Sequence, residues 1–266
     1  MKNFILGLGH QKCGTSWLHS YMSQSEFFAS GYAKEYQIWN RIDIPIFQYK
    51  LANFSFGKIL SPKRFRAYRM EKTEKFYFDY FENLLTSDKN FTADITPCYS
   101  GLKSSRLKRI QSAFKSRGIE TKVVILVRDP LSRIKSAVRF NLDRLDYSEG
   151  ISKGETDFNK ALLEYYRSDF CILHTNYQNI ITEASKVFPS ENVYIGFYEN
   201  MFSEREISRL SNFIGIEPKF EYSKVFVNKT IGSIEETNSD IVIKEFYSDT
   251  YDFFHNNYPI TKELWV

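Results

Sequence analysis

The sequence contains little cysteine and no long hydrophobic run. Its three cysteines, Cys13, Cys98 and Cys171, are too few and too widely spaced for a disulfide framework or a zinc site. No stretch approaches the roughly 18 apolar residues of a membrane-spanning helix. The beginning of the chain also lacks the pattern of a signal peptide. These absences predict a protein that has no membrane span, uses no metal and lies in the reducing environment of the cytoplasm.

Internal repeats, low-complexity tracts and linkers rich in Pro, Gly and Ser are also missing, so we expect a single domain over residues 1–266. Strand-like runs alternate with helical patterns along the chain. Strands are expected over 2–8, 91–95, 123–127 and 193–198, and helices over 15–24, 61–85, 102–117, from about 131, within 156–187, and over 204–214 and 242–257. This alternation predicts an α/β fold with a mostly parallel sheet flanked by helices. Residues 36–60 and 216–238 fit no element, and we expect binding loops there.

The net charge of +4 is mild, but the charges are unevenly distributed. Residues 101–145 hold twelve Lys or Arg against three Asp or Glu, whereas residues 231–266 hold seven acidic residues against two basic ones. A local basic patch suits an anionic ligand. A protein that only binds nucleic acid would need stacking aromatics among these charges, and the basic segment contains only Phe114 and Phe140. We therefore expect no nucleic-acid partner.

The stretch GLGHQKCGTSW comes directly after the first expected strand. Gly9 and Gly14 keep the glycine spacing of a nucleotide-binding phosphate loop, and Ser16 keeps the position of its hydroxyl. However, Thr15 stands where the usual lysine should be, and Lys12 lies inside the loop. The backbone N–H groups at the start of the next helix can still bind an anion. A small dianion fits this loop better than a magnesium-bound triphosphate does. A phosphate-loop kinase of a small metabolite or nucleoside would bind such a triphosphate, and it is therefore kept as the alternative.

A second element suited to anions lies at 123–140, VVILVRDPLSRIKSAVRF. The β-branched run predicts a strand buried on both faces, and Arg128 stands at its end. Ser136 follows on the next expected helix. A guanidinium binds a phosphate with two hydrogen bonds, and a hydroxyl adds a further donor. Both anion elements follow strands at their carboxyl ends, where open α/β sheets bind ligands.

These two elements resemble those of the sulfotransferase family, whose sulfuryl donor is 3′-phosphoadenosine 5′-phosphosulfate (PAPS). The first resembles the family's 5′-phosphosulfate loop, and Arg128 with Ser136 is similar to its 3′-phosphate element. The resemblance implies a phosphate-loop-like fold, PAPS as donor, adenosine 3′,5′-bisphosphate (PAP) as product and no metal. The loop residues that it implies as donor ligands are Lys12, Cys13, Gly14, Thr15, Ser16 and Trp17.

Three shorter stretches extend the resemblance, and the first two resemble the glycosaminoglycan branch of the family. Lys34-Glu35 resembles a Lys-Glu pair in which the glutamate is the general base. Asp94 begins a segment that resembles the short strand and turn before the basic helix in the same branch. Lys229-Thr230 lies in a stretch similar to a loop that closes over the donor, although Ile231 replaces a usual basic residue. The terminal ITKELW also resembles a segment common in the family.

The resemblance implies a division of roles within the site. Lys12 is expected at the oxygen where leaving-group charge develops, and Glu35 is expected to take the proton of the acceptor hydroxyl. Lys34 and Asp94 are expected to bind the acceptor, for which a carbohydrate is favoured. Alternatives stay open: His10 or His19 could be the base, Glu35 could form a surface ion pair with Lys34, and Asp94 could cap a turn. The sequence leaves the oligomeric state open.

Overall fold

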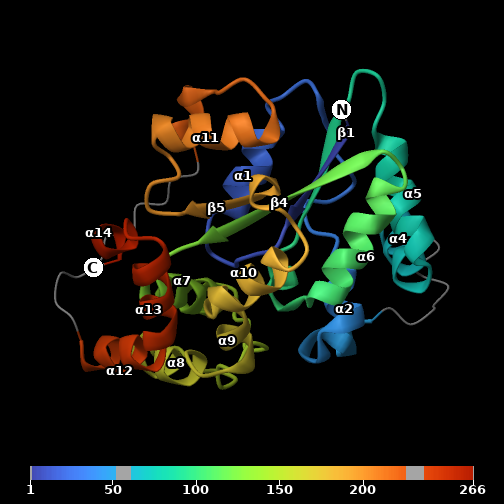
Figure 1. Ribbon diagram of the computed structural model, residues 1–266. Coiled ribbons are helices and arrows are strands. Elements are labelled where there is room, and N and C mark those ends of the chain that lie inside the picture. Colours follow the sequence, from blue (N-terminus) through green and yellow to red (C-terminus); the bar gives the residue numbers. More distant parts are fainter. Residues whose placement is uncertain (1, 52–60, 226–236, 266) are drawn as a thin grey trace.

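The computed structural model describes residues 2–51, 61–225 and 237–265 (Figure 1). A sheet of five strands runs through its centre in the order β2-β3-β1-β4-β5, and every neighbouring pair is parallel. The strands are β1 (Lys2–Gly7), β2 (Phe28–Ala29), β3 (Phe91–Ile95), β4 (Ile119–Val127) and β5 (Val193–Phe197). The α/β fold with a parallel sheet flanked by helices is therefore confirmed.

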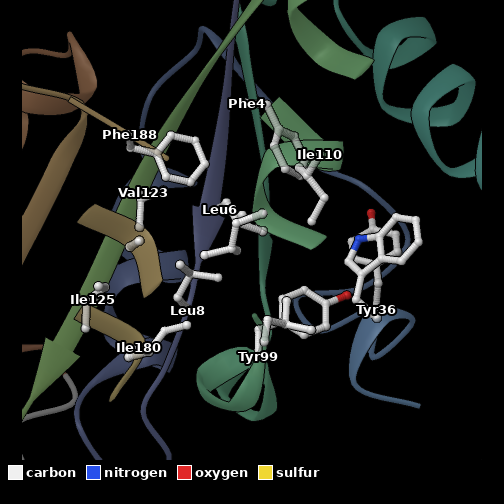
Figure 2. Close-up of a cluster of buried hydrophobic side chains, with 14 of the residues drawn as sticks. Phe4, Leu6, Leu8, Tyr36, Tyr99, Ile110, Val123, Ile125, Ile180 and Phe188 are labelled. Carbon is white, nitrogen blue, oxygen red and sulfur yellow. The ribbon is translucent and has the colours of Figure 1, made fainter. Parts of the chain in front are cut away.

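Helices cover both faces of this sheet. On one face, Ile5 of β1 and Leu126 of β4 pack with residues of α1 (Thr15–Met22) and α11 (Glu204–Ile214). On the other face, Phe4 packs with residues of α5 (Glu74–Leu84), α6 (Ser104–Lys115), α10 (Tyr177–Ser185) and α13 (Ser248–Asn257). Figure 2 shows this second face, where Leu6 and Val123 from adjacent strands lie in the same cluster. Burial on both faces explains why the central strands read as continuous apolar runs.

Three expected helices are each divided in the structure. The helix expected over 61–85 forms α4 (Pro62–Lys72) and α5, because Thr73 between them has extended backbone angles, φ −142° and ψ 100°. Residues 156–187 form α8 (Phe158–Tyr165), α9 (Asp169–Thr175) and α10, and the Ser168 side chain caps the second of these. The last expected helix forms α12 (Asn238–Phe246), which begins at a Thr237 capping box, and α13. Side-chain caps at Ser168 and Thr237 therefore set two helix starts that the sequence pattern did not give.

The remaining helices lie close to their expected bounds. The expectation that residues 36–60 form a loop is wrong for residues 36–51, the part that the structure describes. The helix after β4 is α7 (Pro130–Asp143), and a short α14 (Thr261–Leu264) ends the described chain. Residues 36–51 contain α2 (Trp39–Asp43) and the 3-10 helix η1 (Pro45–Lys50). Trp39 is fully buried, and its ring centroid lies 4.7 Å from that of Tyr77. This tertiary contact has no counterpart in local sequence propensity.

Three further 3-10 helices join the main elements: η2 (Pro97–Gly101), η3 (Ser190–Asn192) and η4 (Phe220–Lys224). The last of these lies in the second segment expected to be a loop, residues 216–238, so that expectation is wrong at this point. Within the parts of the chain that the structure describes, no helix has the length and apolar character needed to cross a membrane.

Candidate active site

A cavity of about 620 Å³ opens where the loop after β1, the end of β4 and helix α7 meet. Its volume lies in the range of about 300–1,000 Å³ that is usual for small-molecule sites. Nine of its lining residues were predicted from the sequence as site residues: Lys12, Gly14, Thr15, Ser16, Trp17, Lys34, Glu35, Arg128 and Ser136. The structure thus brings both predicted anion elements and the Lys-Glu pair to one cavity.

The loop after β1 leads into the start of α1 with a left-handed backbone. Gly14 has φ 91°, and a Cβ at this position would lie 2.7 Å from the Met201 Sδ, so only glycine fits here. Because glycine is the N-cap, no side chain caps the first turn of α1. Its backbone N–H groups are therefore available to an anion in the cavity.

Cys13 of this loop and Trp17 of α1 are buried in different ways. Cys13 is fully buried and lies outside the cavity lining, and burial raises the pKa of its thiol to about 12. Its side chain therefore packs as a neutral group below the loop. Trp17 is 2% exposed, and its Nε1 donates a hydrogen bond to the Tyr222 carbonyl oxygen at 3.1 Å. Its ring also stacks on Tyr21 with an interplanar angle of 7°, which fixes an aromatic surface in the cavity wall.

Lys12 is the cation that the loop itself contributes. Its backbone φ of 66° is unusual for a residue with a side chain. Its Nζ lies 4.1 Å from the centroid of the Phe140 ring. Partial burial, together with the nearby positive charges of Arg128 and Arg144, lowers the pKa of this ammonium. An anion that enters the cavity would relieve the repulsion among these cations.

Arg128 lies at the end of β4 and is 9% exposed. Its Nη1 donates a hydrogen bond to the Lys12 carbonyl oxygen at 3.5 Å, and its Cζ lies 4.3 Å from the centroid of Tyr198. These contacts join the end of β4 to the loop after β1. Ser136 is placed in the same wall by α7.

Hydrogen bonds around Asp129 fix the turn that follows Arg128. The Asp129 side chain caps α7 by accepting a hydrogen bond from the Ser132 N–H at 2.7 Å. The Asp129 N–H donates to Glu199 at 2.7 Å, and Trp265 Nε1 donates to the same carboxylate at 3.2 Å. The terminal segment ITKELW therefore supports this turn through Trp265.

Lys34 and Glu35 line the cavity beside the loop after β1. The Lys34 Nζ lies 2.7 Å from Glu35 Oε1 and donates hydrogen bonds to Ser16 Oγ at 3.0 Å and to Thr15 Oγ1 at 3.4 Å. Glu35 Oε2 accepts a hydrogen bond from Gln37 Nε2 at 3.3 Å. The ion pair of the alternative interpretation is therefore present, and it lies within the cavity.

Asp94 lies away from the cavity, and its side chain is fully buried. Its carboxylate accepts hydrogen bonds from the hydroxyls of Thr96 at 2.6 Å, Tyr99 at 2.8 Å and Tyr77 at 2.9 Å, and from the Tyr36 N–H at 3.3 Å. Burial raises the pKa of this carboxyl to about 6. Because Tyr36 follows Glu35 in the chain, this cluster holds the segment that carries the Lys-Glu pair. Asp94, which the sequence placed with the acceptor ligands, does not line the cavity that holds Lys34 and Glu35.

The two histidines that rivalled Glu35 lie outside the cavity lining. His10 is fully buried, its Nδ1 lies 3.1 Å from the Leu126 carbonyl oxygen, and burial lowers its pKa to about 3. His19 lies on α1 and packs edge-on against Phe28, with ring centroids 5.7 Å apart. Lys229 and Thr230, expected to close over the donor, lie outside the described residues.

The cavity is also lined by residues that the sequence analysis did not identify. They are Gln11, Ser20, Gln37, Phe47, Lys50, Pro97, Cys98, Phe140, Arg144, Glu149, Tyr198 and Phe202. Helical spacing could have identified two of them, because Phe140 and Arg144 follow Ser136 by four and eight residues on the same face of the helix. The Glu149 carboxylate accepts hydrogen bonds from Gln11 Nε2 at 3.4 Å and Asn141 Nδ2 at 3.2 Å. Its place in the wall depends on these tertiary contacts.

Comparisons with known proteins show the family and the fold of this chain. A family model described as "Sulfotransferase domain" matches residues 3–251. Among solved structures, a sulfotransferase from Alicyclobacillus acidocaldarius is similar, with a TM-score of 0.60 and 19% identity over 96% of this chain and 95% of the other. The sulfotransferase domain from the curacin biosynthetic pathway has a TM-score of 0.51 and 14% identity over 93% of this chain and 98% of the other. No curated protein sequence matches this chain.

Proposed function

Since the chain belongs to the sulfotransferase domain family, whose model matches residues 3–251, we propose that it transfers a sulfuryl group from PAPS to a carbohydrate hydroxyl. The observation that carries this proposal is the meeting of Lys12, Arg128 and Glu35 in one cavity. Two cations can bind an anionic donor, and a carboxylate beside them can take the proton of an acceptor hydroxyl. The three residues come from three separate segments, so their meeting is a property of the fold.

The residues at the cavity fit a nucleotide that carries phosphate groups at two ends. The open N–H groups of α1, with Thr15 and Ser16, suit the 5′-phosphosulfate. Arg128 and Ser136 suit the 3′-phosphate because a guanidinium and a hydroxyl both donate hydrogen bonds to phosphate oxygens. Trp17, Tyr198 and Phe202 add aromatic surface to the same cavity, against which a base can pack.

The proposed reaction moves the sulfuryl group in line between two oxygens. Glu35 takes the proton of the acceptor hydroxyl as the new bond forms between that oxygen and sulfur. Lys12 stabilises the negative charge on the bridging oxygen as its bond to sulfur breaks and PAP leaves. Lys34 bonds to both Glu35 and Ser16, so it holds the base at a fixed place beside the donor loop. Positioning and charge stabilisation carry the catalysis, much as in phosphoryl transfer.

A polar wall supports the proposed carbohydrate acceptor. Gln11, Gln37 and Glu149 line the cavity with Glu35, and they offer both hydrogen-bond donors and acceptors. Hydroxyl-rich molecules need many such partners because each hydroxyl can donate one hydrogen bond and accept others. Phe47 supplies an apolar surface against which a sugar ring can pack.

A transfer assay with labelled donor tests the proposal. The full chain is incubated with PAPS labelled in its sulfuryl group and, separately, with a hydroxyl carbohydrate, a phenol or a lipid alcohol. We expect label on the carbohydrate. Label found only on the phenol or the lipid alcohol would contradict the acceptor class. Phosphoryl transfer from ATP and magnesium, with no sulfuryl transfer to any acceptor, would instead support the phosphate-loop kinase.

A further inference from the structure

The ring of Phe140 lies between the donor loop and the end of α7 and contacts a cation from each. Lys12 Nζ lies 4.1 Å from the ring centroid, and Arg144 Cζ lies 4.3 Å from it. Both distances fall within the roughly 6 Å over which an aromatic face attracts a cation. All three residues line the cavity. A half-buried aromatic ring at this place is therefore in electrostatic contact with the loop cation.

Lys12 has few other groups that could hold its ammonium. No ion pair joins Lys12 to a carboxylate within 4.0 Å in the described part of the chain. The charged and titratable groups that act on it are Arg128 from β4, Arg144 and Asp143 from the end of α7, and Cys13 from its own loop. The two arginines repel the ammonium, while Asp143 and Cys13 favour its charged form. The Phe140 ring is the partner in direct contact.

We propose that Phe140 is a positioning residue that holds the Lys12 ammonium, in its charged form, against the α7 wall before the donor binds. The face of the ring attracts the ammonium without neutralising it, so Lys12 stays available to an incoming anion. A carboxylate at the same place would form an ion pair and compete with the donor. Arg144 contacts the same ring, and its positive charge disfavours the charged form of Lys12. Phe140 and Arg144 therefore act on the Lys12 ammonium in opposite directions. The positioning itself concerns the unliganded protein, and only its catalytic consequence rests on the proposed function.

Amine labelling of the unliganded protein tests the positioning directly. The rate at which an acylating reagent modifies Lys12 is measured against pH by mass spectrometry, and its midpoint reports the pKa of this ammonium. In Phe140→Leu, which keeps the apolar bulk, the midpoint should fall by about half a pH unit or more, since a cation–π contact favours the charged form. Phe140→Tyr should restore the wild-type midpoint. Arg144→Gln should move it the other way, because removing a nearby positive charge favours the ammonium.

These outcomes separate the proposal from a packing role. If Phe140→Leu and wild type share one midpoint while both are folded by circular dichroism, the proposal is overturned. If the leucine variant does not fold, Phe140→Met makes the same comparison, and a wild-type midpoint in that folded variant overturns the proposal. Turnover adds a second readout. Phe140→Leu should lower kcat about threefold to tenfold, with the PAP dissociation constant within a factor of two, whereas an equal loss in kcat and in PAP affinity would indicate a general distortion of the site.

Discussion

Lys34 and Ser16 are 18 residues apart in the chain, and Lys34 Nζ donates a hydrogen bond to Ser16 Oγ at 3.0 Å. The same Nζ lies 2.7 Å from Glu35 Oε1. One ammonium therefore joins the donor loop to the proposed base. The backbone of Lys34 is held at the end of β3, where its carbonyl oxygen accepts a hydrogen bond from the Ile95 N–H at 3.0 Å. This places the Lys34 side chain beside the donor loop. The first prediction follows from this bridge.

Replacing Lys34 should reduce turnover without unfolding the protein. In Lys34→Met we expect kcat to fall at least about tenfold, the scale of a lost hydrogen bond to a charged group. The melting temperature should barely change, because a partly exposed ion pair contributes only about 0–1 kcal/mol. Lys34→Arg, which keeps the charge, should retain more activity than Lys34→Met. Equal kcat values for wild type and Lys34→Met would show that the bridge has no catalytic role.

Glu35→Gln tests the proposed base while keeping the shape of the side chain. General base catalysis contributes roughly 10²–10⁴-fold, so kcat with the true acceptor should fall by at least about two orders of magnitude. Binding of PAP and the free energy of unfolding should remain near their wild-type values. A variant that keeps more than about a tenth of wild-type kcat would place the base elsewhere. Glu149→Gln would then be tested next, because Glu149 also lines the cavity.

Lys12→Ala should act on the chemical step. Loss of one donor to developing charge typically lowers kcat by about 10²–10³-fold, and we expect at least the lower of these values. Lys108→Ala is a matched control, because Lys108 lies on α6 and its Nζ donates to Gln111, away from the cavity lining. The control should keep wild-type kcat. A higher donor KM with unchanged kcat in Lys12→Ala would remove the catalytic role assigned to this lysine.

The buried carboxyl of Asp94 should make stability depend on pH. Its pKa is raised by burial to about 6, against an ordinary value of 3.8 in the unfolded chain. The folded state therefore binds the proton more tightly, and this contribution to stability is present below pH 4 and is lost as pH rises through about 6. We expect the free energy of unfolding of wild type, relative to Asp94→Asn, to fall by up to about 3 kcal/mol over this window. Denaturant titrations at several pH values measure it, and parallel curves would contradict the assignment.

The sequence predicted the central strands well because their signals are local. The β-branched run at 123–127 became the carboxyl-terminal part of β4, since a strand buried on both faces favours apolar residues throughout. Lys12 and Arg128 could be placed in one site because parallel strands deliver their carboxyl ends to the same edge. Their shared cavity follows from topology, and the topology follows from alternation of strands and helices.

Other features depend on contacts that the local sequence does not encode. Lys50 reaches the cavity from the 3-10 helix η1 and Glu149 through tertiary hydrogen bonds, and neither stands at a strand end. The break at Thr73 depends on one residue adopting extended angles inside the helix expected over 61–85. For Asp94 the sequence identified the motif, but only the structure shows what the side chain contacts. Its carboxylate oxygens accept hydrogen bonds from the hydroxyls of Tyr77, Tyr99 and Thr96.

The central claim is that one cavity binds a nucleotide with a 3′-phosphate, and Arg128 tests it most directly. Isothermal titration calorimetry compares adenosine 3′,5′-bisphosphate with adenosine 5′-phosphate on wild type and on Arg128→Gln. Wild type should bind the bisphosphate at least about tenfold more tightly, the lower end of what a hydrogen bond to a charged group contributes. Arg128→Gln should reduce this preference to near unity while its affinity for the 5′-phosphate stays close to wild type. Equal affinity of wild type for the two nucleotides would contradict the account.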